Sequence, residues 1–365
     1  MAIHPLTGHH AARQQLATAR SRGSLPQVIA LVGPEGVGKQ RLALWLAQLV
    51  LCEHPGAEPC GGCIACAQVL NLSYPDLHWL SPVLRPKAAD ADKQVEEMAE
   101  LQGELIAERR ERPLYGPPDG LAGHFVSTAR LIQKRAALTP AAGHWKVFIV
   151  GHAERLVPQE SAADAANALL KLFEEPPANT IIILTTTDLS ALLPTIRSRA
   201  VPLRLGRLAD SEVTAFLREH LDPVPRPDQL TERVRLAEGA IGPALSGAAE
   251  NHAAREAAHQ ILDAVLEAPA VRAERALRQP PYSARGEFTA TLDELGRTLA
   301  DAARQAAGHQ SKAPLPRGLP GRAGIAALSE ASGRVAAARE AAQGNVNPQL
   351  LMAVLLDDLA EVLCG

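Results

Sequence analysis

The chain has 365 residues, of which 47% are hydrophobic and 21% charged, and its net charge is −3. This length and composition predict two or three globular domains and exclude an intrinsically disordered chain. The small acidic charge and the 3% of aromatic residues argue against a general polyanion binder and against base-stacking platforms. The sequence contains neither a bilayer-spanning apolar segment nor a secretory signal pattern, so we expect a cytoplasmic protein.

Predicted strands and helices alternate through the first 207 residues. The expected strands cover residues 28–32, 76–80, 146–150 and 180–185. The expected helices cover residues 1–25, 39–51, 128–137 and 162–174. Short apolar runs between turn residues are typical of strands buried in a parallel sheet. The alternation therefore predicts a doubly wound α/β domain over residues 1–207.

Two regions depart from this alternation. The stretch at about residues 83–125 is charged and helix-prone over 93–112 and then rich in proline and glycine. We expect an exposed insertion there, to which the sequence assigns no role. Beyond residue 207 strand signals disappear, which predicts a small helical unit over 208–249 and an all-α bundle over 250–365. A loop rich in proline and glycine, at about residues 309–321, interrupts the bundle.

The segment between the first predicted strand and the helix at 39–51 is glycine-rich and contains a lysine. Its residues are Gly33, Pro34, Glu35, Gly36, Val37, Gly38, Lys39 and Gln40. In such a strand–turn–helix context, backbone N–H groups bind phosphate and the lysine reaches the outer phosphates. A hydroxyl residue usually follows the lysine and holds Mg²⁺, whereas Gln40 offers an amide, a poorer ligand. The pattern predicts a degenerate phosphate loop and leaves open whether ATP or ADP binds.

The predicted strand at 146–150 lacks the acidic ending of a hydrolysing ATPase. Such enzymes place an Asp-Glu pair there, to hold Mg²⁺ and to polarise the attacking water. Here Gly151 and His152 follow the strand. Glu154 lies two residues further on, in a turn that would aim it elsewhere, and we expect it to be a solvated carboxylate. The sequence thus predicts the scaffold of an ATPase without its chemistry.

Four of the five cysteines lie close together, at Cys52, Cys60, Cys63 and Cys66. The short spacings, with two glycines between Cys60 and Cys63, let the chain curl round a tetrahedral Zn²⁺. Buried or redox cysteines are the alternative, but a redox Cys-x-x-Cys pair normally stands without two more cysteines nearby. We therefore expect a structural zinc site with four thiolate ligands and no role for His54 or Cys364.

Several segments resemble the bacterial clamp-loader subunits of the AAA+ superfamily. Residues 166–177 read ANALLKLFEEPP, and residues 186–199 contain TTD followed by LPTIRSR. The cysteine knuckle and the segment NVNPQLL at 345–351 extend the resemblance over most of the chain. It implies an α/β P-loop (AAA+) domain over 1–207, with a parallel sheet and an inserted zinc knuckle at 52–66. It further implies a small helical lid domain over 208–249 and an all-α collar domain, for oligomerisation, over 250–365.

Within this family, gamma/tau motor subunits hydrolyse ATP and a stator subunit does not. The motor keeps a hydroxyl after the loop lysine, the Asp-Glu pair and an arginine in the lid known as sensor 2. This chain has Gln40, then Gly151 and His152, and no arginine over residues 237–243. The resemblance therefore implies a stator without intrinsic ATPase activity, within the DNA polymerase III holoenzyme, that helps to load the sliding clamp in DNA replication.

Ser198 and Arg199 keep the Ser-Arg pair of a family signature, with Ala200 in place of its cysteine. From the residues alone, a surface arginine paired with a local carboxylate is the favoured interpretation. The resemblance instead implies an arginine finger that reaches, in trans, the γ-phosphate bound to a neighbouring motor subunit. Lys171 is expected on a solvated helix face rather than on DNA phosphate.

The resemblance implies the gamma/tau motor subunits and the delta subunit as direct partners. The sliding clamp and primer-template DNA would be reached through the complex, at the nucleoid-associated replisome, with no membrane contact. Two alternatives remain open: a gamma/tau-type motor ATPase and a zinc-dependent DNA-binding adaptor. ATP turnover by the isolated chain would favour the first, and salt-sensitive DNA binding the second. The sequence does not decide ring stoichiometry or direct DNA contacts.

Overall fold

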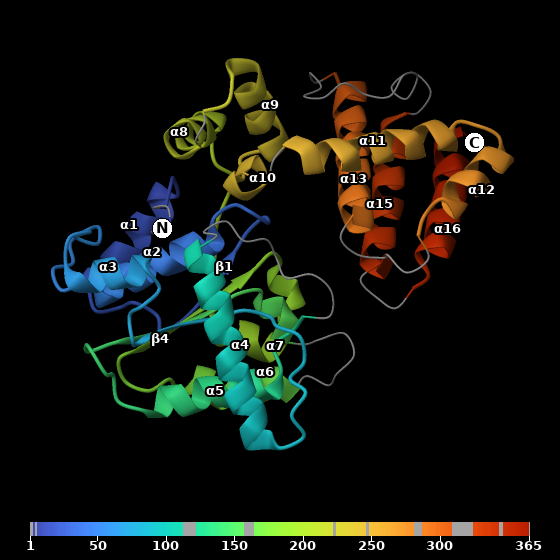
Figure 1. Ribbon diagram of the computed structural model, residues 1–365. Helices are drawn as coiled ribbons and strands as arrows, with labels where there is room; N and C mark the ends of the chain where they lie inside the picture. Colours follow the sequence, from blue (N-terminus) through green and yellow to red (C-terminus); the bar gives the residue numbers. More distant parts are fainter. Residues whose placement is uncertain are drawn as a thin grey trace. The chain divides into compact units, whose positions relative to one another are not determined.

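A computed structural model of the chain is shown in Figure 1. It describes residues 3, 6–111, 122–156, 164–221, 224–245, 248–280, 287–308, 324–342 and 346–364. The chain divides into two compact units, residues 1–245 and 246–365, and each unit is described by itself.

A five-stranded parallel sheet forms the centre of the first unit. Its strands are β1 (Val28–Val32), β2 (Leu77–Leu80), β3 (Lys146–Val150), β4 (Thr180–Thr186) and β5 (Val201–Arg204). They lie in the order β2-β3-β4-β1-β5, and every neighbouring pair is parallel. The predicted parallel sheet and its four predicted strands are confirmed. Strand β5 was not predicted, because it lies at the sheet edge, is largely exposed and contains Pro202, so that it carries little apolar signal.

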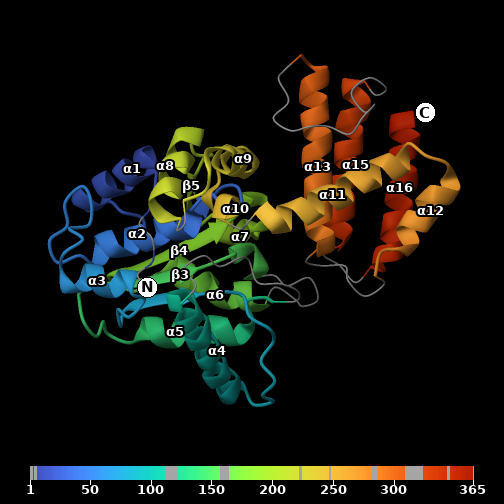
Figure 2. The same ribbon diagram turned by 45° about the horizontal axis from the view of Figure 1, so that its top comes forward.

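Helices cover both faces of this sheet (Figures 1 and 2). On one face lie α1 (His10–Ser21), α2 (Lys39–Leu51) and α3 (Ile64–Leu70). On the other face lie α4 (Ala91–Glu111), α5 (Val126–Ala137), α6 (Asp164–Glu174) and α7 (Pro194–Arg197). Alternate residues of β1 enter the two cores, with Ile29 and Leu31 in the first and Ala30 in the second. Because both faces are covered, the central strands are apolar at almost every position.

The expectation of an exposed insertion is wrong for residues 91–111. Val95 and Met98 of α4 are buried in the core that α4 shares with α5 and α6. The amide of Gln102 accepts a hydrogen bond from the Ser81 N–H at 2.9 Å and donates to its carbonyl at 2.8 Å. The charges that suggested exposure occupy one side of a helix whose other side carries these three residues at helical spacing. The proline- and glycine-rich part at 112–121 lies outside the described residues.

Three helices follow β5 within the first unit: α8 (Asp210–His220), α9 (Pro227–Ala237) and α10 (Ile241–Leu245). They enclose a small core of Val213, Phe216, Leu217, Leu230, Val234 and Ala244. We call α8–α10 the lid. The described part of residues 208–245 contains helices but no strand, in keeping with the loss of strand signals in the sequence.

The second unit is helical throughout its described residues. It contains α11 (Ala248–Val265), α12 (Pro269–Leu277), α13 (Glu287–Ala306), α15 (Ile325–Ala342) and α16 (Pro348–Cys364) (Figure 1). Leucine and alanine side chains form most of its core. Asn347 caps α16 by accepting a 2.9 Å hydrogen bond from the Gln349 N–H. Asn345 and the predicted loop at 309–321 fall outside the described residues. None of the helices that the structure describes has the length and apolarity needed to cross a membrane.

Candidate functional site

The phosphate loop, residues 33–40, connects the carboxyl end of β1 to the first turn of α2. Gly36 and Gly38 have φ angles of 69° and 105°, in the left-handed region that favours glycine. A Cβ atom on Gly33 would lie 2.6 Å from the carbonyl oxygen of Leu205. The backbone therefore requires glycine at all three positions. The loop lies at the N-terminus of a long helix, where N–H groups are available to an anion.

Lys39 is turned into the loop that it follows. Its side-chain Nζ donates hydrogen bonds of 2.7 Å to the carbonyl oxygens of Gly33 and Pro34. Only 8% of the residue is exposed. This burial lowers the pKa of Lys39 to about 8, against the opposing charges of Glu154 and Glu35. To reach a bound phosphate, Lys39 must first release both carbonyl oxygens.

Gln40 lies against Gly151, so two of the positions that depart from an ATPase are neighbours in space. A Cβ atom on Gly151 would be 3.3–3.4 Å from the three amide atoms of the Gln40 side chain. In an ATPase, a hydroxyl and a carboxylate hold Mg²⁺ at such a site. Here an amide lies beside a residue without a side chain. The arrangement provides neither of the usual protein ligands for Mg²⁺.

Glu154 is not the solvated carboxylate that the sequence suggested. It lies in a short 3-10 helix (Ala153–Leu156), and its side chain is 21% exposed. Its Oε1 lies 3.4 Å from Nδ1 of His152. Burial raises the pKa of Glu154, but hydrogen bonding and charge at His152, with a further hydrogen bond from Thr186, lower it overall. In the turn between β3 and Glu154, His152 adopts a left-handed conformation, with φ of 53°.

His124 is a residue of this region that the sequence analysis missed. It is completely buried, and its Nε2 lies 2.7 Å from the carbonyl oxygen of Gly151. Because a carbonyl oxygen only accepts, Nε2 carries the proton. Burial lowers the pKa of His124 to about 4, so the ring is neutral at pH 7. A single histidine after a proline- and glycine-rich segment gives no sequence signal for this contact.

Arg199 makes its contacts within its own chain. Its Nε donates to Glu174 Oε1 at 2.9 Å, and its Nη2 forms a second, shorter contact with the same oxygen. Its Nη1 donates to the carbonyl oxygen of Thr195 at 2.7 Å and to Ser198 Oγ at 3.1 Å. This is the local pairing that the residues alone favoured. Glu174 was not singled out from the sequence, although it lies in the segment that carries the family resemblance.

The four cysteines converge between α2 and α3. Cys52 follows the last residue of α2, Cys63 caps the N-terminus of α3, and Cys66 lies in its first turn. All four sulfur atoms lie within 4.8 Å of one another, with Cys52–Cys63 at 4.0 Å and Cys60–Cys66 at 3.9 Å. A tetrahedral site with Zn–S bonds of ~2.3 Å requires sulfur atoms ~3.8 Å apart. The four thiols therefore fit zinc.

Backbone N–H groups stabilise negative charge in this cluster. The N–H of Cys60 donates to the Cys52 sulfur and that of Cys66 to the Cys63 sulfur, each at 3.4 Å. The N–H groups of Gly62 and Cys63 lower the pKa of Cys60 to about 7. Metal binding requires thiolates, so these hydrogen bonds favour the form that binds zinc.

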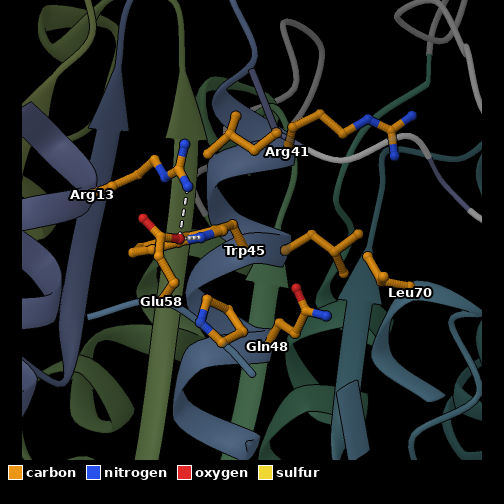
Figure 3. Close-up of a pocket in the computed structure, with 9 residues that line it drawn as sticks. Arg13, Arg41, Trp45, Gln48, Glu58 and Leu70 are labelled. Carbon is orange, nitrogen blue, oxygen red and sulfur yellow. Dashed lines mark hydrogen bonds and ion pairs between the residues drawn. The ribbon is translucent and has the colours of Figure 1, made fainter. Parts of the chain in front are cut away.

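The loop between Cys52 and Cys60 is tied to the two nearest helices by Glu58 (Figure 3). The Glu58 carboxylate accepts a 2.7 Å hydrogen bond from the Trp45 indole N–H and lies 2.7 Å from Nη2 of Arg13. The Arg13 guanidinium lies 5.4 Å from the centre of the Trp45 ring. These side chains line a small pocket of about 190 Å³ together with Gln48 and Leu70. The cysteine loop thus contacts both α1 and α2.

The predicted residues fall into three separate places. Lys39, Gln40 and Gly151 lie together, after the carboxyl ends of β1 and β3. Arg199 lies two residues before β5 begins, at the amino-end edge of the parallel sheet. The cysteine cluster follows the C-terminal end of α2, whose N-terminal end carries the phosphate loop. Arg199 therefore lies at the amino ends of the strands, whereas the phosphate loop of the same chain lies at their carboxyl ends.

A parallel α/β sheet with a glycine-rich loop and lysine between β1 and α2 defines a P-loop protein. The sequence pattern of the family described as "DNA polymerase III, delta subunit" matches residues 8–209. Since this match covers more than half of the chain, the protein belongs to that family.

Individual relatives agree with this family. Residues of this chain are 35% identical over 173 positions to DNA polymerase III subunit delta' of Pseudomonas aeruginosa, covering 47% of this chain and 40% of that protein. The Bacillus subtilis protein of the same name is 30% identical over 173 positions, covering 47% of this chain and 39% of that protein. The DNA polymerase III subunit gamma/tau of Mycobacterium tuberculosis is 31% identical over 193 positions, covering 52% of this chain and 26% of that protein. The chain thus matches less than half the length of these relatives.

Among solved structures, a gamma subunit-related protein of Thermotoga maritima aligns with a TM-score of 0.41 and 17% identity. The alignment covers 95% of this chain and 99% of that one.

Proposed function

We propose that the chain is the delta-prime, or stator, subunit of a bacterial DNA polymerase III clamp loader. Membership of the family and the delta-prime relatives support this assignment. In this role it would assemble with gamma/tau motor subunits and a delta subunit in the cytoplasm, at the nucleoid-associated replisome. The complex would act on the sliding clamp and on primer-template DNA in replication.

The phosphate loop supports a subunit without ATPase activity of its own. Lys39 is engaged by two carbonyl oxygens of the loop, and Gln40 lies beside Gly151 where an ATPase needs Mg²⁺ ligands. Without these ligands, neither the metal nor the attacking water is held for hydrolysis. No step of the proposal requires a nucleotide on this chain's own loop.

Arg199 is proposed to act on a neighbouring motor subunit. The observation that carries this proposal is its position at the amino-end edge of the sheet, across the domain from its own phosphate loop. A guanidinium there is outside the reach of a nucleotide in cis, but it is available to a nucleotide bound at a subunit interface. Ser198 accepts a hydrogen bond from Arg199 and would help to orient it. A finger of this kind stabilises charge on the phosphoryl group in the transition state.

Cys52, Cys60, Cys63 and Cys66 are proposed to hold a structural zinc ion. Zinc would supply the cross-link that joins the end of α2 to the start of α3 and fixes the loop carrying Glu58. Four thiolates leave no coordination position for water, so the ion would have no catalytic role. Through Glu58, the same loop positions Arg13 of α1 and Trp45 of α2.

Reconstituted rings test this function. Rings assembled with and without the chain should differ in DNA-stimulated ATPase activity and in clamp loading. In rings containing Arg199→Ala, assembly should be unchanged and the ATPase should fall only in part, because the one motor site that faces this chain loses its finger. Losses of about 10³–10⁵ are known where a single site depends on such an arginine. Full activity with Arg199→Ala would overturn the trans role.

A gamma/tau-type motor is the second candidate, because gamma/tau relatives match the chain and the loop keeps its glycines and lysine. The two candidates predict different ATPase activity for the isolated chain. A motor would turn over ATP at a steady rate in the presence of Mg²⁺, whereas the stator would not. Turnover within about tenfold of a motor subunit's rate would overturn the stator assignment.

A further inference from the structure

The lid touches the phosphate loop directly, backbone to backbone. The N–H of Gly242, in α10, donates a 3.1 Å hydrogen bond to the carbonyl oxygen of Gly36. Pro243 packs beside this bond, against the same residue of the loop. Both partners belong to the first compact unit, so the contact lies within one folded body.

This contact depends on glycine on both sides. A Cβ atom on Gly242 would lie 2.9 Å from the Gly36 Cα, and a Cβ atom on Gly36 would lie 2.4 Å from Cδ of Pro243. Atoms do not approach so closely, so any side chain at either position forces the lid and the loop apart. Gly242 also lies in the stretch of residues 237–243 where the sequence shows no arginine.

The lid is held at a second point, where the segment that leads into it meets the turn between α9 and α10. The Leu208 N–H donates a 2.8 Å hydrogen bond to the carbonyl oxygen of Gly239. Arg207 Nη1 donates to the carbonyl oxygen of Glu238 at 2.6 Å. Leu205 in turn donates to the carbonyl oxygen of Val32, the last residue of β1, at 2.7 Å. The turn before α10 and the segment before α8 are thus bound to each other, next to the loop.

The remaining loop carbonyl oxygens with recorded partners also bind groups of this chain. Lys39 engages those of Gly33 and Pro34, and His9, which precedes α1, lies with Nε2 2.7 Å from that of Val37. With Gly242 on Gly36 and the Leu42 N–H on Gly38, five carbonyl oxygens of residues 33–38 have partners inside the chain. Groups of this chain therefore hold the loop on two sides, through His9 before α1 and through Gly242 of the lid.

We propose that the phosphate loop of this chain serves as the docking site of its own lid, through Gly242 and Pro243 on Gly36. In this arrangement the position of the lid is set by the loop backbone and does not depend on a bound nucleotide. Its meaning for a clamp loader rests on the stator role proposed above: a subunit whose lid stays fixed gives the motor subunits a constant surface against which to move. The contact itself is a property of the isolated chain.

Hydrogen exchange of the purified full-length chain tests the proposal. Gly242→Ala should speed amide exchange in α10 and in residues 33–39 by about tenfold, the change expected when one backbone hydrogen bond and its packing are lost. Gly206→Ala is the matched control, since a Cβ atom there meets nothing within 4 Å and the residue lies between β5 and the lid. Equal exchange in the two variants would overturn the proposal.

Helix propensity and misfolding are two other possible causes of a change in exchange, and both can be excluded. Alanine favours a helix over glycine, so faster exchange in α10 of Gly242→Ala cannot come from helix propensity. If Gly242→Ala does not fold, Pro243→Ala keeps the backbone hydrogen bond and removes the Cδ contact, and it should speed exchange by a smaller factor of about two to three. Exchange of Pro243→Ala identical to that of the unsubstituted chain would contradict a role for Pro243 in docking.

Addition of millimolar Mg²⁺-ADP to the unsubstituted chain tests whether the lid is independent of nucleotide. We expect lid exchange to change by less than about twofold. A larger change, in either direction, would show that the lid follows nucleotide and would overturn this part of the proposal. This result is independent of the ring assay. Full activity of rings with Arg199→Ala would overturn the trans role but not the lid contact, and unchanged exchange in Gly242→Ala would overturn the lid contact but not the trans role.

Discussion

Arg199 and Glu174 form an ion pair that joins the segment before β5 to the last residue of α6. The guanidinium also donates to Thr195 and Ser198, so its hydrogen bonds are directed into its own chain. Glu174 is 47% exposed, and it lies at a helix C-terminus, where a negative charge is unfavourable in the absence of a cation. An arginine that acts in trans must therefore exchange Glu174 for a phosphate. Glu174 competes with the proposed function of Arg199.

Removal of this competitor should raise activity in the ring. Exposed ion pairs contribute about 0.2–1 kcal/mol, so Glu174→Gln should increase the ATPase of reconstituted rings by at most about fivefold. Glu175→Gln changes the same net charge at the next residue, for which no contact with Arg199 is recorded, and should have no effect. A fall in ATPase with Glu174→Gln, as large as that with Arg199→Ala, would show that Glu174 orients the arginine rather than competing for it.

The purified chain should contain about one zinc ion per molecule. Substitution of both Cys60 and Cys63 by serine should abolish metal binding, because two thiolates do not hold zinc tightly, and should lower the free energy of unfolding by several kcal/mol. Elemental analysis and urea unfolding measure the two effects. Cys364→Ser, at a cysteine outside the cluster, is the control and should retain the metal. A chain purified without chelator that contains no zinc would refute the site.

Zinc removal should also change the fluorescence of Trp45. Its indole N–H is held by Glu58, which lies in the loop between two of the ligands. A chelator should free this loop and shift the emission, whereas Trp45→Phe should lose most of the chelator-dependent change although Trp79 and Trp145 remain. An equal chelator response in Trp45→Phe would mean that the cysteine loop does not position Trp45.

Acidification should destabilise the chain through His124. The pKa of this residue is about 4 in the folded state, below its ordinary value of 6.5, because of burial. The unfolded chain therefore takes up the proton first as the pH falls from 6.5 to 4. The contribution of His124 to stability is complete above pH 6.5 and is lost across this interval, by up to about 3 kcal/mol.

Urea unfolding at several pH values measures this loss. Between pH 6.5 and 4, the free energy of unfolding should fall less steeply in His124→Gln than in the unsubstituted chain, because glutamine keeps a donor for Gly151 but does not titrate. His10→Gln, at a side chain that is 79% exposed, should follow the unsubstituted chain. The comparison of variants cancels the effects of the other titrating groups, which include the cysteines and the partly buried His78. Parallel curves for His124→Gln and the unsubstituted chain would contradict a buried neutral His124.

Gly151 and Gln40 should be coupled in stability. A Cβ atom on Gly151 would crowd the Gln40 amide, so Gly151→Ala should cost about 1–2 kcal/mol in the unsubstituted chain. The cost should shrink when Gln40 is also replaced by alanine, and a double-mutant cycle of urea unfolding measures the difference. Gly103→Ala, where a Cβ atom meets nothing within 4 Å, should not depend on residue 40. Strict additivity at 40 and 151 would contradict their contact.

Sequence by itself determined the features that depend on residues close together along the chain. Buried strands appear as apolar runs, as in β1 and β3, because both faces of a parallel sheet are covered. The phosphate loop appears in its glycines because left-handed backbone excludes most other residues, and the cysteine cluster appears in its short spacing. β5 lacked such a local signal.

Tertiary structure decided what depends on residues that meet only after folding. The pairing of Arg199 with Glu174 joins positions 25 residues apart, and that of His124 with Gly151 joins positions 27 apart. Docking of Gly242 on Gly36 brings the lid onto the phosphate loop, and neither glycine signals its partner in the sequence. No local pattern encodes these contacts, because the packing of helices on the sheet decides which side chains become neighbours, which charges are buried and which hydrogen bonds can form.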